Sequence, residues 1–301
     1  MESAFSVVIA THNRRHIVAR AITSALTQND GRPEVIVVDD ASADGTGHYV
    51  TTTFPEVRYH AMPASRGPGP SRNFGIRSAT GRWVLVLDDD DELRPDAISI
   101  IRARLADCDR IERFPVVAFG RTDGALDVPF EISRVPDLWG RHRHGNFVSV
   151  WNRDVAAAAG CAYPEHRLGA EALMWIEVAE RYGIPTWADC VGIAHREAGP
   201  HLLARQTDPK DAADRAGIAD AIVRGLAPYD ADPHVHRVVT DRILSAGTYL
   251  VMAGQRGEAL KRARTLLSRQ PIGAVKLAIA SVLPRSLVVR RFLARRRQAG
   301  A

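Results

Sequence analysis

The chain is poor in cysteine, with three in 301 residues. Cys108, Cys161 and Cys190 lie far apart, so they have neither the spacing of a metal-binding motif nor the even number of a disulfide framework. The sequence therefore excludes a small disulfide-stapled fold and a cysteine-based zinc site. It fits a reducing compartment.

Long apolar runs are also missing. No window reaches the roughly 18 apolar residues that span a bilayer, because the run 272–283 is short and contains Lys276. The first residues lack the basic start and apolar stretch of a secretory signal. We therefore expect a cytoplasmic protein, with the inner face of the membrane as an alternative location.

A basic face is missing from most of the chain. The formal net charge is +5, but six arginines and no acid follow Pro284, so the rest of the chain carries −1. A nucleic-acid-binding protein would spread basic residues over its folded body. Nucleic acid is therefore not expected as a partner.

What the sequence does contain is an alternation of short apolar runs with helical patterns. Strands are predicted at 6–10, 34–39, 57–61, 83–87, 116–120 and 147–151. Helices are predicted between them at 16–28, 43–52, 71–79 and 95–106. This order predicts an α/β fold with a doubly wound, mainly parallel sheet.

The pattern changes after about residue 205, where alanine, leucine and arginine dominate. Helices are predicted there at 215–226, 238–252 and 258–268. We therefore expect two parts, a ligand-binding and catalytic domain over 1–205 and a helical C-terminal region over 206–301.

Polar residues follow three of the predicted strands, at 11–15, 39–44 and 88–92. Ligands of doubly wound sheets bind at the carboxyl ends of the strands. We therefore expect these three segments to meet in one site.

The segment 88–92 is a run of five acids, Asp-Asp-Asp-Asp-Glu. Adjacent carboxylates raise one another's pKa unless a cation is present, and carboxylate oxygens suit hard cations such as Mg²⁺ or Mn²⁺. The alternative is a solvated acidic turn before the helix that begins near Pro95, where acids are favourable in any case.

Three segments together resemble family 2 glycosyltransferases with the GT-A fold. They are "SVVIATHNR" at 6–14, "VIVVDDASADGT" at 35–46 and "RGPGPSRNFGIRSATGRWVLVLDDDDEL" at 66–93. The last segment ends in the acidic run, where the family has its Asp-x-Asp motif. The resemblance covers roughly residues 5–200 and rests on the order of the motifs as well as on their residues.

The resemblance implies roles for individual residues. Nucleotide-sugar contacts are implied for Thr11, Arg14, Asp39, Asp40, Arg72, Asp88 and Asp89. Within this set, Asp40 would face the base and Asp88 would lie near the ribose. Asp90 would bind the metal, Mn²⁺ or Mg²⁺, although the acidic Asp89 leaves the assignment open by one residue.

The second half carries two further features that are similar to the family. Glu171, in a segment at 152–183, falls at the position of the catalytic base. The family usually has Glu-Asp there, whereas this chain has Ala170-Glu171. "GIAHREAG" at 192–199 resembles the segment whose histidine completes the metal site, which implies His195 as a second ligand.

The implied activity is an inverting transfer of a sugar from a nucleotide-sugar donor to a hydroxyl acceptor, with UDP as the expected nucleotide. One base and one metal suffice for a single displacement. The acceptor stays open between a glycan, a lipid-linked glycan, a natural product and a protein. Two alternatives are a metal-dependent sugar nucleotidyltransferase and a non-catalytic GT-A binding module.

Two basic segments lie outside these motifs. The first, 141–144, is interpreted either as a solvated loop or as a contact for phosphate or an anionic acceptor. The second, 286–297, has the pattern of a basic amphipathic helix. It predicts either a peripheral contact with an anionic membrane or a solvated terminus.

Overall fold

The computed structural model describes residues 4–139, 142–195 and 208–299. The chain divides into two compact units, Met1–His195 and Arg196–Ala301. The boundary predicted near residue 205 lies outside the described residues. Among the described residues, no helix combines the length and the apolar character needed to cross a membrane.

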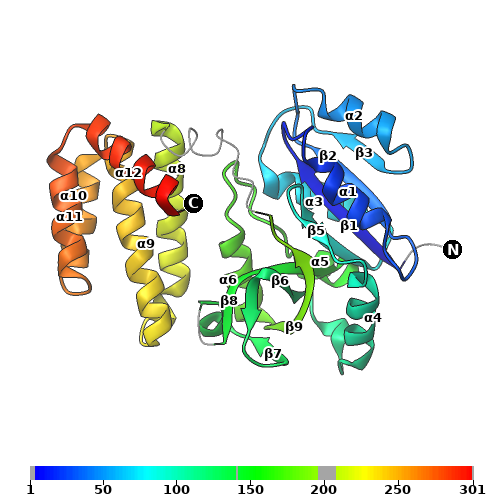
Figure 1. The fold of residues 1–301 in the computed structure, drawn as a ribbon. Coiled ribbons are helices and arrows are strands. Elements are labelled where there is room, and N and C mark those ends of the chain that lie inside the picture. Colours follow the sequence, from blue (N-terminus) through cyan, green and yellow to red (C-terminus); the bar gives the residue numbers. More distant parts are fainter. Residues whose placement is uncertain (1–3, 140–141, 196–207, 300–301) are drawn as a thin grey trace. The chain divides into compact units, whose positions relative to one another are not determined.

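The first unit is built on a mixed sheet (Figure 1). Its strands are β1 (Phe5–Thr11), β2 (Glu34–Asp39), β3 (Arg58–Ala61), β4 (Trp83–Asp88), β5 (Glu92–Leu93), β6 (Val116–Leu126), β7 (Phe130–Ser133), β8 (Arg143–Asn152) and β9 (Ile184–Ile193). Their order is β3-β2-β1-β4-β8-β6-β9-β5, and β7 pairs with β9. β1 to β4 are parallel, as predicted, whereas β8 runs antiparallel to both β4 and β6.

The helices of this unit follow the strands in the predicted alternation. They are α1 (Val18–Leu26), α2 (Thr46–Thr53), α3 (Pro68–Ser78), α4 (Ala97–Asp107), α5 (Arg153–Ala159) and α6 (Glu171–Arg181). The apolar residues of α1 and α4 pack with alternate strand residues such as Val7 and Ile9 in one buried core. α3 packs on β1 and β2, and its Gly75 lies where a Cβ atom would meet Val8. Val8 alternates with Val7 and Ile9, so α3 covers the other face of the sheet.

The second unit is entirely helical in its described part. Its helices are α8 (Pro209–Leu226), α9 (Pro233–Met252), α10 (Arg256–Leu266), α11 (Pro271–Val282) and α12 (Arg285–Ala299). α8 and α9 each begin with an aspartate, Asp208 or Asp232, whose carboxylate accepts two backbone N–H groups. A proline follows each aspartate at the first helical position, which it suits.

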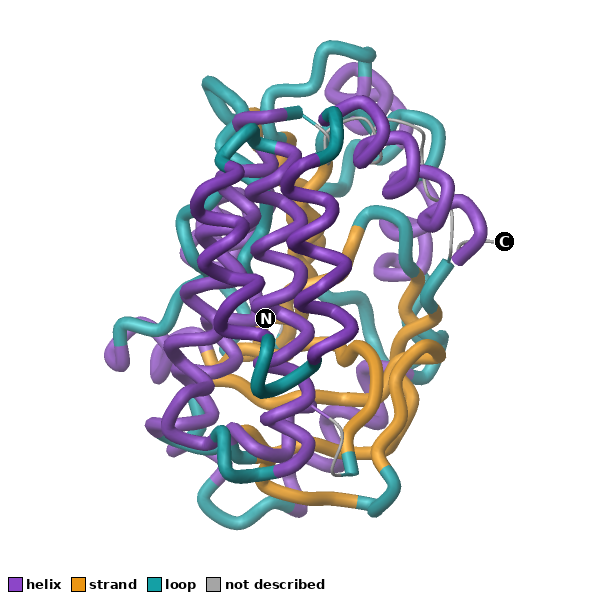
Figure 2. Tube along the Cα trace, turned by 90° about the vertical axis from the view of Figure 1, so that its left-hand side faces the viewer, coloured by secondary structure: helices purple, strands orange, loops and turns teal. Residues whose placement is uncertain are grey.

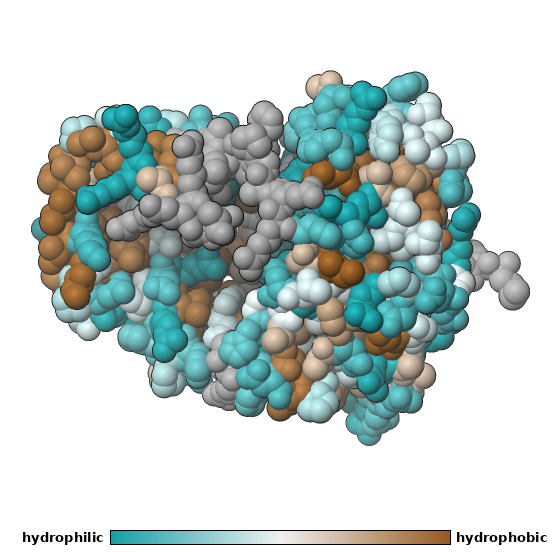
Figure 3. Space-filling view, in the orientation of Figure 1, coloured by the Kyte–Doolittle hydropathy of each residue, from teal (hydrophilic) through white to brown (hydrophobic). Residues whose placement is uncertain are grey.

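The long helices of this unit pack side by side (Figure 2). α9 packs against α8, α10 and α11, and it carries the largest share of the buried apolar side chains of the unit. Apolar residues also gather on the surface over α10 and α11 (Figure 3).

Candidate functional site

The three polar segments meet at one edge of the sheet. β1 is hydrogen-bonded to β2 on one side and to β4 on the other, with Thr11 opposite Asp39 and Ala10 opposite Asp88. All three strands run in the same direction, so their carboxyl ends lie next to one another. The expected convergence is therefore confirmed.

The acidic run turns sharply after β4, which folds its carboxylates toward one another. Ligand oxygens of Asp88, Asp90 and Asp91 lie within 4.8 Å of one another. Three carboxylates gathered in this way match the oxygen preference of Mg²⁺ and Mn²⁺. The residues present therefore fit a hard divalent cation.

Four arginines surround the run and offset its charge. They come from four different elements or turns, namely Arg14, Arg20, Arg72 and Arg121. Arg14 lies 3.3 Å from Asp90, and Arg20 lies 3.5 Å from Glu92. Arg121 pairs with Asp91 and lies 3.4 Å from Asp88. Five acids and four arginines leave this cluster close to neutral, with a small excess of negative charge.

Burial and these partners shift the pKa values within the run in opposite directions. Burial disfavours the charged form of Asp88, but Arg72 and Arg121 outweigh it and lower the pKa of that carboxyl. Burial raises the pKa of Asp89 to about 6, against the opposing effects of Arg14 and Thr11. Burial also raises the pKa of Asp91 to about 6, even though Arg121 favours its charged form. Two carboxyls of the run are therefore poised to take up protons in mildly acidic solution.

The predicted donor residues of β1 and its following turn contact the acidic run directly. The hydroxyl of Thr11 donates to Asp89 at 2.8 Å, and Arg14 reaches Asp90. Arg14 is largely buried, with 20% of its side chain exposed. The fold thus brings these predicted residues together.

Arg72 connects the acidic run to the predicted base. Its guanidinium donates to Asp88 at 2.6 Å and to Glu171 at 2.5 Å. Burial lowers the pKa of Arg72, but Asp88, Tyr163 and Glu171 outweigh it and hold the pKa well above its ordinary value. Glu171 opens α6 and keeps 39% of its side chain exposed, so it remains accessible to an acceptor.

The position of Arg72 is fixed by the segment that leads to α6. Its guanidinium carbon lies 5.3 Å from the centre of the Tyr163 ring, within cation–π range. The neighbouring Asn73 is buried, and its amide exchanges two hydrogen bonds with the backbone of Tyr163, at 2.8 and 2.9 Å. α3 and the segment before α6 are therefore held in register.

Two glycines allow this close approach. Gly67 has a φ of +97°, and a Cβ atom there would lie 2.4 Å from the carbonyl oxygen of Arg167. A Cβ atom on Gly69 would lie 2.3 Å from the carbonyl oxygen of Pro164. Any side chain at either position would push the segment that leads to Glu171 away from α3.

Asp39 and Asp40 lie one strand away, and both are buried. Asp39 accepts hydrogen bonds from the Tyr59 hydroxyl and from the backbone N–H of Ser42. Asp40 accepts from the backbone N–H groups of residues 66 and 67, which shapes the loop before α3. Both aspartates thus hold loops of the site in place, and their contact with a nucleotide stays a prediction.

His195 lies at the rim of the acidic cluster. Its Nε2 atom is 3.1 Å from Glu92, and its backbone N–H donates to Asp91 at 3.3 Å. Among the described residues, the group of potential ligand atoms contains Asp88, Asp90 and Asp91 and does not include His195. The assignment of His195 as a metal ligand stays a prediction.

The basic segment at 141–144 is only partly a solvated loop. His142 and His144 are exposed and lie near Glu131 and Asp127. Arg143 is buried, with its guanidinium 4.2 Å from the Phe147 ring centre and 5.0 Å from that of Trp175. Burial lowers the pKa of Arg143 to about 10. Arg141 lies outside the described residues.

Arg20, Arg121 and Asp91 are charged residues of the described site that sequence reasoning missed. Arg121 directly follows the predicted strand 116–120, so it occupies a strand end of the kind that holds the other site residues. Its position at a strand end could therefore have marked Arg121 as a site residue. Asp91 belongs to the recognised acidic run. Its side chain is 5% exposed and pairs with Arg121, and this contact depends on the turn of the chain after β4, which the sequence does not show.

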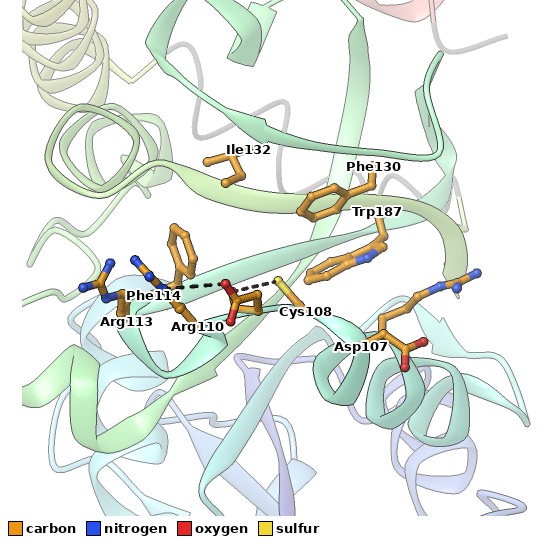
Figure 4. A pocket seen from close by; sticks show the side chains of 10 residues that line it. Asp107, Cys108, Arg110, Arg113, Phe114, Phe130, Ile132 and Trp187 are labelled. Carbon is orange, nitrogen blue, oxygen red and sulfur yellow. Dashed lines mark hydrogen bonds and ion pairs between the residues drawn. The ribbon is translucent and has the colours of Figure 1, made fainter.

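A separate hollow lies at the amino end of β6 (Figure 4). Trp187, Phe130 and Ile132 lie on one side of it, and the segment that follows α4 lies on the other (Figure 4). No residue predicted for the site lines it. The hollow is therefore distinct from the acidic cluster.

Sequence comparisons connect this geometry to known proteins. Residues 6–152 match the family described as "Glycosyl transferase family 2". Succinoglycan biosynthesis protein ExoO of Rhizobium meliloti is 41% identical over 135 residues, which is 44% of this chain and 39% of that protein. GalNAc(5)-diNAcBac-PP-undecaprenol beta-1,3-glucosyltransferase of Campylobacter jejuni is 28% identical over 185 residues, which is 58% of this chain and 59% of that protein. The chain thus matches less than two thirds of the length of these curated relatives.

Solved structures share the fold over nearly the whole chain. TarS 1-349 of S. aureus, in complex with UDP-GlcNAc, has a TM-score of 0.63 at 17% identity. The match covers 97% of this chain and 91% of the TarS chain. Mannosyltransferase PcManGT of Pyrobaculum calidifontis, in complex with GDP-Man and Mn²⁺, has a TM-score of 0.52 at 17% identity. The match covers 96% of this chain and 86% of the PcManGT chain. These likenesses establish a GT-A fold with a helical C-terminal region.

Proposed function

The chain belongs to glycosyl transferase family 2 through residues 6–152, and on that premise we propose that it transfers a sugar, with inversion, from a nucleotide-sugar donor to a hydroxyl acceptor with the help of a divalent cation. The arrangement around Arg72 carries the proposal. One guanidinium joins the acidic cluster, which would hold the donor, to Glu171, which would serve the acceptor.

Each side chain has a chemical task in this proposal. Asp88, Asp90 and Asp91 would hold the cation, which supplies positive charge for the departing diphosphate. Arg14 and Arg72 add fixed positive charge beside the same cluster.

Glu171 accepts the proton of the acceptor hydroxyl as that oxygen attacks the anomeric carbon. A single displacement of this kind needs no nucleophile from the protein. It inverts the configuration at the anomeric carbon.

UDP is the nucleotide proposed first, and GDP is the comparison. TarS was solved with UDP-GlcNAc and PcManGT with GDP-Man, so both nucleotides occur on similar folds. The relative from Campylobacter jejuni is named for an undecaprenol-linked acceptor. We propose a lipid-linked glycan as the first acceptor class to test, ahead of other glycans, natural products and proteins. A peripheral position at the inner face of the membrane, reached through the basic C-terminal tail, would suit such an acceptor.

The donor half of this proposal is tested by thermal unfolding of the full chain with UDP or GDP, each with and without Mn²⁺. A ligand present at a hundredfold its Kd stabilises the folded state by about 2.7 kcal/mol. For a unit of this size, that should raise the Tm by roughly 5–10 °C. We expect the rise to need Mn²⁺ and to disappear in Asp90→Ala, because that change removes one oxygen ligand.

The matched control is Asp96→Ala. Asp96 follows the acidic run closely, but it is exposed and pairs with Arg94 outside the cluster. This variant should keep the full Mn²⁺-dependent rise. The proposal fails if neither nucleotide shifts the Tm of a cooperatively folded wild-type protein, or if Asp90→Ala keeps the whole shift.

A further inference from the structure

α11 presents an unpartnered apolar stripe on the second unit (Figure 3). The exposed fractions are 70% for Ile272, 54% for Val275, 52% for Ile279 and 69% for Val282. Their spacing of three and four residues places them on one helical face. The opposite face, which includes Leu277, is buried in the unit, and α11 packs on α10 and α9. The stripe is therefore an outward surface of a well-anchored helix.

The stretch of sequence that contains this stripe carries charge of one sign, although Arg262 and Arg269 pair with Asp220 and Asp230 of the same unit. After Glu258 the sequence has no acid to its end, whereas it has eleven lysines and arginines. Lys276 is exposed within α11 itself, and Arg264 is exposed on α10, which packs against α11. Arg290 and Arg291 are exposed on α12, which follows α11 in the chain. Because the whole chain carries +5, residues 1–258 carry a net charge of −6. The apolar stripe and the positive charge thus share one part of the molecule.

The side chains of α12 show which helix supplies the apolar contact. Val288 is buried, and the Phe292 ring packs against Tyr249 of α9 with 6.1 Å between ring centres. These two apolar residues of α12 therefore face their own unit, while Leu287, Arg290 and Arg291 are exposed. α12 therefore offers mainly charge and the single aliphatic side chain of Leu287, whereas α11 offers four exposed aliphatic side chains.

We propose that the α11 stripe inserts into the interface of an anionic lipid bilayer, with the basic residues around it on the lipid phosphates. Aliphatic side chains flanked by lysine and arginine are the pattern of interfacial helices, and each basic residue near an anionic surface adds to the attraction. Single-stranded nucleic acid is disfavoured, because its binding sites use aromatic stacking surfaces and the stripe is aliphatic. Two copies meeting through this face would bring exposed basic residues of the same sign together, such as Arg264 and Lys276 of each copy.

The test uses the full chain and vesicles of phosphatidylcholine, with and without phosphatidylglycerol, in a co-sedimentation assay. We expect binding to the anionic vesicles, and we expect it to weaken as salt is raised. The variant Ile272→Ser/Val275→Ser/Ile279→Ser should bind at least about tenfold more weakly, because it removes the inserting aliphatic groups. Lys276→Gln should weaken binding about fivefold, the effect of one basic residue near the surface.

The matched control is Phe130→Ser/Ile132→Ser. Phe130 and Ile132 are exposed apolar residues of the first unit, at 41% and 42%. This control should bind vesicles like the wild type. Thermal unfolding checks that the α11 variant is folded, and Val275→Ser alone replaces it if it is not.

Equal binding by the α11 variant and the wild type would overturn the inference, as would equal binding to neutral and anionic vesicles. A dimer in sedimentation velocity that the α11 variant abolishes, without any vesicle binding, would assign the face to a second copy instead. The inference deepens the proposed peripheral membrane contact. The assay contains neither donor nor acceptor, so its failure leaves the proposed sugar transfer untouched.

Discussion

At the scale of single residues, Arg72 is the side chain on which the proposed chemistry depends most. It spans from Asp88 to Glu171, and 13% of its side chain is exposed. A planar guanidinium with several donors can hold two carboxylates at once, whereas an ammonium group acts as a single point of charge. One side chain therefore links the acidic run directly to Glu171.

We predict that Arg72→Ala lowers kcat for hydrolysis of the preferred nucleotide-sugar by about 10- to 100-fold, since small misplacements of catalytic groups cost that much. Glu171→Gln removes the proposed base and should lower kcat at least as far. The control is Arg66→Ala, because Arg66 lies just before the same helix but pairs with Glu165 at the surface, where 55% of each side chain is exposed. If Arg72→Ala raises only the KM for the donor, the arginine binds the nucleotide and does not position the base.

The residues that the sequence could predict are those whose role is visible in a local motif. Thr11, Arg14 and the acidic run follow buried strands, and the rule that ligands bind at strand ends locates them. The contacts of Arg121 with Asp91, and of Arg72 with Glu171, join residues 30 and 99 positions apart. Such pairs depend on how strands and helices are placed in space, which a local pattern does not encode.

At the scale of elements, the amino ends of four neighbouring strands are joined by one carboxylate, Glu34 of β2. Its oxygens accept hydrogen bonds from Ser6 of β1 at 2.5 Å, from Arg58 of β3, and from Thr80 just before β4. Burial opposes ionisation, but these hydrogen bonds outweigh it and lower the pKa of Glu34 from 4.5 to about 2. This network lies at the end of the sheet opposite the acidic cluster.

We predict that Glu34→Gln lowers the free energy of unfolding of the first unit by about 1.5–3 kcal/mol at pH 7, the range for hydrogen bonds to a charged group. The pKa of Glu34 is lower in the folded state, so the charged form stabilises the fold above pH 4.5. This contribution fades as the pH falls from 4.5 toward 2. Denaturant unfolding of wild type and variant at a series of pH values measures the difference.

The control for this prediction is Glu56→Gln. Glu56 lies 3.9 Å from Arg32 in an exposed pair, and such pairs contribute about 0–1 kcal/mol. A difference between wild type and Glu34→Gln that stays constant down to pH 2 would mean that the charge of Glu34 does not carry the effect.

The predicted elements agree best with the observed ones where the apolar pattern of the sequence is strong. They agree less well where pairing with another strand extends an element beyond that pattern. β1 to β4 and α1 to α4 overlap the predicted segments, and α3 begins at Pro68, earlier than the predicted 71. β6 and β8 extend beyond the predicted 116–120 and 147–151, because they pair with each other through polar stretches and a bulge near Gly120. β9 was not predicted, since Pro185 and Asp189 interrupt its apolar pattern. β9 forms because it pairs with β5, β6 and β7, and a local apolar pattern does not show this pairing.

At the scale of the whole molecule, the two units have separate cores. Ile101 of α4 is fully buried in the core of the first unit. Ile243 of α9 is 5% exposed and belongs to the helical unit. A nucleotide bound at the carboxyl ends of β1 and β4 contacts the first unit. Ligand binding and core substitutions should therefore act on distinguishable parts of the unfolding transition.

We predict two calorimetric transitions that respond independently. Ile243→Val removes one buried methyl group and should cost the helical unit about 0.5–1.5 kcal/mol, which lowers its Tm by several degrees. Ile101→Val should cost the first unit a comparable free energy and so lower the Tm of the other transition. The nucleotide with Mn²⁺ should raise only the transition that Ile101→Val lowers, because binding stabilises the unit that holds the site. If both substitutions and the ligand move one shared transition, the chain unfolds as a single cooperative block. The helical unit would then contribute directly to the stability of the donor site.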